Sequence, residues 1–196
     1  MKNLKFKFLF VLIASVALLA GCNDDEEEEE VSPFIGSYVI AKAALTAPLV
    51  LTTNFGPYTV NTGTDISQLI QQSLLSALTC TPDKSLIELK DDYSMLMKCE
   101  GTSTQIDAGT WEVVSATVLK LNMNNKAIPS SSTGFVLTVN NVKLENKKLS
   151  GETSVPIPKE TIALMVSAMS GGLATLNMDV TPVVVPISFS IELTQK

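Results

Sequence analysis

The carboxyl-terminal segment of this 196-residue chain alternates strictly between apolar and polar side chains. Ile187, Phe189, Ile191 and Leu193 are apolar, and the residues between them are polar. Successive side chains of a β-strand point to opposite faces, so a period of two predicts a half-buried strand with one face in solvent. A chain made of such segments must pair them into sheets with one covered face, which favours an antiparallel barrel or sandwich.

Further segments of this kind follow one another at short spacing along the chain. One covers residues 135–139, is interrupted at Asn140-Asn141 by an expected bulge or bend, and resumes at Val142. Gly, Asn, Asp and Ser residues separate the segments, as is typical of the turns that join short strands. The other expected strands are residues 35–41, 48–53, 58–62, 86–90, 94–98, 110–114, 117–123 and 149–155.

Two segments have the period of a helix instead. Asp65 and Gln68 have the spacing of a capping box, and one apolar face follows, made of Ile66, Leu69, Ile70, Leu74, Ala77 and Leu78. Gln68, Gln72 and Ser76 face the other way. The second segment follows Pro158, ends at Gly171-Gly172, and places Ile162, Met165, Val166 and Met169 on one face.

Both helices are expected to pack one face against the sheet. The alternative is a lid over the mouth of a barrel, in which Met165 and Met169 would make soft, adaptable contacts with a ligand. Residues 129–134, which include three serines in a row, are expected to form a surface loop between strands.

Residues 1–21 have the parts of a bacterial signal peptide. Lysines at the start precede an apolar run at 8–19, and Ala20-Gly21 places small residues directly before Cys22. The run is short for a bilayer-spanning helix, which needs about 20 apolar residues. An uncleaved membrane anchor is the alternative, but a spanning helix has no need of small residues before a cysteine. The pattern resembles the lipobox of bacterial lipoproteins, which implies cleavage after residue 21 and lipidation of Cys22.

Every residue from 24 to 30 is Asp or Glu. Such a run is a solvated, self-repelling linker. Its place beside the anchor also resembles the export signal of surface lipoproteins of Bacteroidota, which implies an outer-membrane protein exposed at the cell surface. Under the Lol sorting rules of enteric bacteria, Asn23 in place of Asp after the cysteine would also permit delivery to the outer membrane. We therefore expect a lipidated acidic tether at residues 22–32, which makes the membrane a partner, and one domain at 33–196.

Cys80 and Cys99 remain once Cys22 is acylated. An exported chain meets an oxidising compartment, where an even pair of cysteines is expected to form a disulfide. Two buried free thiols are the alternative. A zinc site is a poorer explanation, since zinc takes four ligands and the chain has no histidine.

A short internal echo, Gly36-Ser37-Tyr38 and Gly109-Thr110-Trp111, carries a family resemblance. Glycine, Ser/Thr and an aromatic residue at the start of a strand look like the lipocalin-like lipoproteins of Bacteroidota, where a cysteine pair often precedes the second copy. The resemblance covers residues 33–123. It implies a mainly β fold, an antiparallel lipocalin-like barrel with one or two short amphipathic helices.

In such a barrel Trp111 either fills one end of the interior or lines a ligand cavity. The other residues that we expect to line a cavity, if one exists, are Phe135, Met165 and Met169.

Composition excludes several activities. Without histidine there is no Ser-His-Asp or Cys-His catalysis, and no glycine-rich phosphate loop occurs. A formal net charge of −6 makes nucleic acid an unexpected partner. Carboxylate chemistry of the glycosidase type remains, with Asp91, Asp92 and Glu100 as the only clustered acids. Asp91-Asp92 is better explained as a turn between strands, and one adjacent pair does not fill the six to eight oxygen sites of calcium.

Three functional hypotheses follow, and none involves a metal or cofactor. The first is a non-enzymatic, lipid-anchored binding module whose barrel holds a small apolar ligand or displays a protein-binding face. The second is an accessory surface lipoprotein that acts through protein contacts in a glycan-uptake or adhesion complex. The third is a carboxylate-dependent glycan hydrolase.

Overall fold

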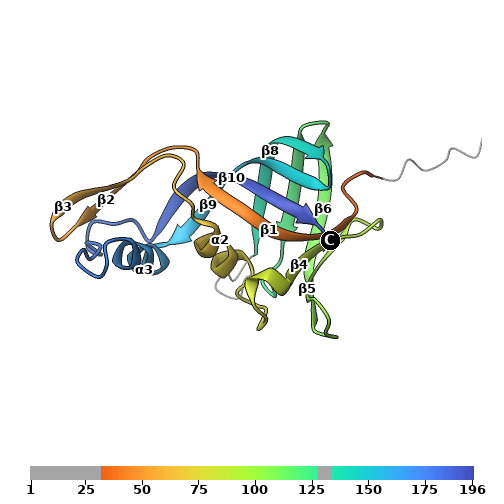
Figure 1. Cartoon of the computed structure of the whole chain (residues 1–196), viewed down its shortest axis with the longest axis horizontal. Helices are drawn as coiled ribbons and strands as arrows, with labels where there is room; N and C mark the ends of the chain where they lie inside the picture. Colours follow the sequence, from red (N-terminus) through yellow and green to blue (C-terminus); the bar gives the residue numbers. More distant parts are fainter. Residues whose placement is uncertain (1–31, 128–133) are drawn as a thin grey trace, which may run out of the picture. The chain divides into compact units, whose positions relative to one another are not determined.

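The structure, a computed structural model, describes residues 32–127 and 134–196 (Figure 1). Eight antiparallel strands close into a barrel, which confirms the mainly β fold class and is consistent with a lipocalin-like fold. Each barrel strand pairs with the next barrel strand along the chain, and the last pairs with the first. Around the barrel these are β1 (Gly36–Leu45), β4 (Ser85–Leu89), β5 (Ser94–Cys99), β6 (Gln105–Ser115), β7 (Val118–Met123), β8 (Phe135–Glu145), β9 (Lys148–Pro158) and β10 (Val184–Gln195).

Because the side chains alternate with a period of two, the apolar ones face the interior of this barrel and the polar ones face its exterior. In β10 the apolar residues from Val185 to Leu193 are buried at every second position, and those between them are half-buried or exposed. The bulge expected at Asn140-Asn141 is confirmed, because the pairing of β8 with β9 shifts register between Asn140 and Lys143. Asn141 adopts a positive φ of 54° at this point.

The strands expected at 48–53 and 58–62 also form, but outside the barrel. They are β2 (Leu49–Thr53) and β3 (Gly56–Val60), which pair only with each other as a named sheet. A tight turn joins them, in which the hydroxyl of Thr53 donates to the carbonyl of Gly56 and accepts from the N–H of Phe55. Because this hairpin closes on itself, the chain returns to the barrel only at β4.

Helix α2 (Ser67–Leu74) is shorter than its apolar pattern predicted, and the predicted capping box is wrong. Its N-cap is Ile66, without a side-chain bond. The Asp65 carboxylate instead accepts hydrogen bonds from the N–H and hydroxyl of Ser67, at 2.8 and 2.6 Å, and these lower its pKa. The Ser67 hydroxyl in turn accepts from the N–H of Ala43, so this network ties α2 to β1.

The short 3-10 helix η1 (Pro82–Lys84) follows α2 and leads into β4. The second predicted helix, α3 (Lys159–Met169), starts after Pro158 and stops before Gly171, as the sequence indicated. The predicted disulfide is confirmed: Cys80 and Cys99 are bonded, with their Cα atoms 5.9 Å apart. The bond joins the segment between α2 and η1 to the end of β5.

Beyond the end of β1, strands β9 and β10 continue together as a ribbon, since Val184–Ser188 pair only with β9. The β2–β3 hairpin, α3 and residues 170–183 gather on this ribbon, and we call them the distal lobe (Figure 1). Backbone hydrogen bonds hold the lobe together, from Asn54 to Thr175 at 3.0 Å and from Asn177 to Thr52 at 2.8 Å. The lobe shares one continuous core with the barrel.

Gly109, the first residue of the second echo, provides a test of the barrel's packing. It has a φ of +124°, and a Cβ at this position would lie on the backbone carbonyl oxygen of Asn122 in β7. We expect Gly109→Ala to lower the free energy of unfolding by about 3 kcal/mol, from strain and overpacking together. Chemical unfolding measures this.

The matched control is Gly101→Ala, in a turn with a φ of +76° and open space around the added Cβ. It should cost only about 1 kcal/mol, for the left-handed conformation alone. Equal costs for the two variants would show that β6 and β7 do not approach as closely as described.

Candidate functional site

The interior of the barrel is filled by its own side chains. The space left among them measures about 10 Å³, roughly what a single water-sized probe occupies. Small eight-stranded barrels are either packed in this way or hold one small ligand. Among the described residues, therefore, the interior has no room for an organic molecule. The side chains around this space are Leu74, Ile87, Leu89, Leu119, Leu121, Met123, Leu137, Val139, Ile191 and Leu193.

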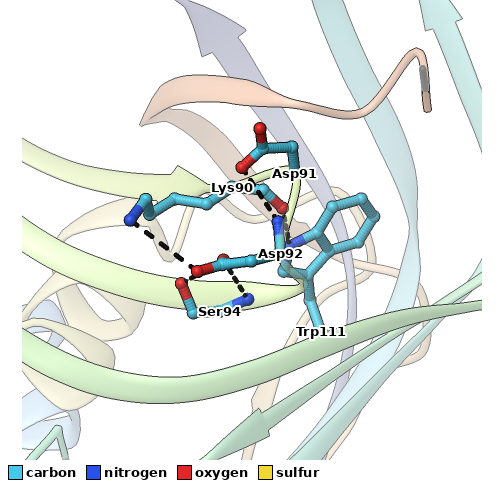
Figure 2. Close-up of polar contacts among 5 residues, drawn as sticks. All are labelled: Lys90, Asp91, Asp92, Ser94 and Trp111. Carbon is cyan, nitrogen blue, oxygen red and sulfur yellow. Dashed lines mark hydrogen bonds and ion pairs between the residues drawn. The ribbon is translucent and has the colours of Figure 1, made fainter.

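Trp111 belongs to the hydrophobic core, and its indole lies against the turn between β4 and β5 (Figure 2). Its side chain is 1% exposed, and its ring lies 5.3 Å from that of Tyr93, centroid to centroid. The indole N–H donates to the carbonyl of Lys90 at 2.9 Å, which fixes the ring against the turn between β4 and β5. Tyr38, the aromatic residue of the first echo, behaves alike: it is fully buried and its hydroxyl donates to the carbonyl of Phe34. Burial raises the pKa of Tyr38.

The clustered acids have structural partners in the turn beside Trp111 (Figure 2). Asp91 accepts from the N–H of Asp92, and Asp92 accepts from the N–H and hydroxyl of Ser94, at 2.9 and 2.5 Å. The hydrogen bonds from Ser94 lower the pKa of Asp92. The carboxylates therefore stabilise a turn, as the alternative interpretation predicted.

Glu100 lies at the other end of β5 and forms an ion pair with Lys196 at 3.2 Å. A six-residue strand spans about 20 Å. Glycosidase carboxylates lie about 5 to 9.5 Å apart, so Asp92 and Glu100 do not form such a pair. In the part of the chain that the structure describes, no three His, Cys, Asp or Glu residues gather as a metal site.

The four residues expected to line a cavity are split by the fold. Trp111 is in the core, and Phe135 is half-buried at the start of β8, opposite Met123. Met165 and Met169 of α3 do come together, on one wall of a groove between α2 and α3. The groove measures about 830 Å³, within the range of ligand sites in proteins.

The two walls of the groove differ in chemistry. The wall of α2 and the turn before it is largely polar, and the wall of α3 is largely apolar. The sequence showed that Gln68 and Gln72 face away from the core, but not that another helix lies across from them. The α2 side contributes Asp65, Ile66, Ser67, Gln68, Leu69, Gln71 and Gln72, and the α3 side contributes Thr161, Leu164, Met165, Ala168 and Met169, with Pro82 at the edge.

The distal lobe carries most of the large apolar side chains that the structure exposes. Phe55 and Leu173 are each 77% exposed. Residues 46–64 contain no charged side chain, and residues 159–191 contain only Lys159, Glu160 and Asp179. The ammonium group of Lys159 is engaged, since it donates to the carbonyl of Met178 at 2.8 Å. The exposed side chains of the lobe are Val50, Phe55, Leu164, Met169, Leu173, Val180 and Val183, and Val184 follows them at the start of β10.

Part of the expected organisation lies outside the described residues. This holds for the signal peptide at 1–21, for Cys22 with most of the acidic tether, and for all of the serine loop except Gly134. None of the helices that the structure describes is long and apolar enough to span a bilayer.

The site of interest is thus the outside of the lobe and the groove, because the barrel interior is closed. No protein-family model matches the chain, and neither the curated proteins nor the solved structures contain a match.

Proposed function

We propose that this chain is a lipid-anchored, non-enzymatic outer-membrane lipoprotein that acts through protein contacts made by its distal lobe. Its domain is a divergent member of the lipocalin-like surface lipoproteins of Bacteroidota, which the echo at Gly36 and Gly109 supports. It serves as an accessory component of a surface complex, of the kind used for glycan uptake or adhesion.

The observation that carries this proposal is the distribution of apolar side chains, which are buried inside the barrel and exposed on the distal lobe. The barrel interior is packed, so a small apolar ligand there would require the core to open. The lobe, in contrast, exposes Phe55, Leu173 and several valines on a nearly uncharged surface. Large apolar side chains that are exposed together on one part of a folded domain are typical of an interaction site. Burying each such side chain on docking contributes about 1.5 to 3 kcal/mol before the costs of association.

The anchor is tested by labelling cells with palmitate. Wild-type protein should incorporate the label, and Cys22→Ala should not, because the thiol that accepts the acyl chain is gone. The double variant Cys80→Ala/Cys99→Ala is the matched control and should keep the label. Equal labelling of the Cys22→Ala protein would refute the lipid anchor.

The docking face is tested by the size of the native complex in mild detergent. Phe55→Ser/Leu173→Ser should run as a free lipoprotein on a native gel, while wild type runs in a larger complex. The matched control is Val114→Ser/Val136→Ser, which removes exposed apolar side chains from the barrel instead. All four positions are on the surface, so the free energy of unfolding should stay within about 0.5 kcal/mol per substitution. A free wild-type protein, or a lobe variant that keeps the complex, contradicts the proposal.

A further inference from the structure

We infer that the groove between α2 and α3 binds an uncharged, extended peptide segment with apolar side chains at alternate positions. This inference rests on the proposed function, because it assigns the segment to the partner protein. In this inference, the groove makes the sequence-specific contact with the partner, and the exposed apolar side chains of the lobe form the surface around that contact.

The polar wall matches the backbone of an extended chain. Gln68 and Gln72 lie four residues apart on α2, about 6 Å along the helix axis. Both side chains are exposed, and neither amide has a hydrogen-bond partner among the described residues. Peptide groups on one edge of an extended segment recur every second residue, about 6.6 Å apart. Each glutamine amide offers one acceptor oxygen and an NH₂ donor, which is what a peptide unit needs.

The remaining glutamine of this wall does not compete for the ligand. The Gln71 amide donates to the carbonyl of Ile40 at 3.0 Å, which holds α2 on β1. The two free amides therefore stand on a helix fixed to the barrel. A recognition surface on a rigid element loses little conformational entropy when it binds.

The opposite wall accepts apolar side chains. Leu164 is 72% exposed, and Met165 and Met169 beside it are flexible thioethers that adapt to the shape of a partner. Side chains of an extended segment alternate between two faces. With its backbone edge on the glutamines, such a segment turns every second side chain toward α3.

Charge and shape select the class of ligand. Asp65 is the only charged residue in the lining, and its carboxylate already accepts two hydrogen bonds from Ser67. None of the described residues that line the groove is a cation that could pair with a phosphate or carboxylate, and the charge of Lys42, which is outside the lining, acts on the Asp65 carboxylate. The lining therefore favours an uncharged segment. The groove is open to solvent, whereas a small molecule is usually buried over most of its surface. A peptide suits an open groove, because its ends continue outside it.

Strand addition to the β2–β3 hairpin is a less suitable mode of binding. The outer strand β3 contains Pro57, which has no N–H to donate and so weakens that edge as a template. The groove offers the better match to an extended backbone.

The test is selection of nine-residue peptides from a phage library on the full-length lipoprotein in lipid nanodiscs. Enriched peptides should be uncharged and apolar at every second position. For the best peptide, labelled with fluorescein, polarization should show about tenfold weaker binding to Gln68→Ala/Gln72→Ala, as expected for two lost hydrogen bonds. N-methylation of alternate backbone amides in the peptide should weaken binding similarly. Gln105→Ala, an exposed glutamine on β6, is the matched control and should bind as wild type does.

Several results would overturn the inference. The first is a selection that enriches only charged peptides. The second is a selection on Met165→Lys protein that enriches the same peptides as wild type. The third is a peptide whose affinity does not change when its backbone amides are N-methylated. Saturable binding of the neutral dye N-phenyl-1-naphthylamine in the groove, with no peptide enriched, would reveal a small-molecule site instead. The inference and the proposed function can fail separately. Phe55→Ser/Leu173→Ser should keep peptide binding, and a groove that binds no peptide while the lobe still holds the native complex removes this inference alone.

Discussion

The structure depends on inward-facing apolar side chains meeting across a closed barrel. Closure between β1 and β10 pairs every barrel strand on both edges, which removes the exposed strand edges that promote aggregation. The side chains then fill the interior almost completely. A filled interior is a good core but a poor binding site, so any binding must occur on the outside. The distal lobe and the groove are where the described surface departs from an ordinary polar exterior.

The two copies of the echo show how a short motif serves such a core. Tyr38 and Trp111 are both buried, and each donates its one polar hydrogen to a nearby backbone carbonyl. Their apolar rings can therefore lie inside without an unpaired donor. Gly109 lets β7 pass where a side chain would collide with it. The residues that carry the family resemblance thus have structural roles in this chain.

Much of the fold could be predicted from the sequence, because a period of two is a local property. The barrel strands, the bulge at Asn140-Asn141, α3 and the disulfide were all predicted. The position of the β2–β3 hairpin outside the barrel was not predicted, because apolar and polar side chains alternate in the same way in strands that belong to a barrel and in strands that do not. The capping box failed because Asp65 bonds to Ser67, which is itself fastened to β1. The groove could not be predicted at all, since it exists only where α2 and α3 meet in space.

The barrel interior is a packed core and not a cavity. Leu121 faces this interior and is 2% exposed, which makes Leu121→Ala the most direct test. Truncating a leucine in a packed core removes buried surface and leaves a void, so the free energy of unfolding should fall by about 3 kcal/mol. Val136→Ala, on the outer face of β8, should change it by less than about 0.5 kcal/mol. A loss below about 1 kcal/mol for Leu121→Ala would show that the interior is not a packed core, since it would mean that space already surrounds this side chain.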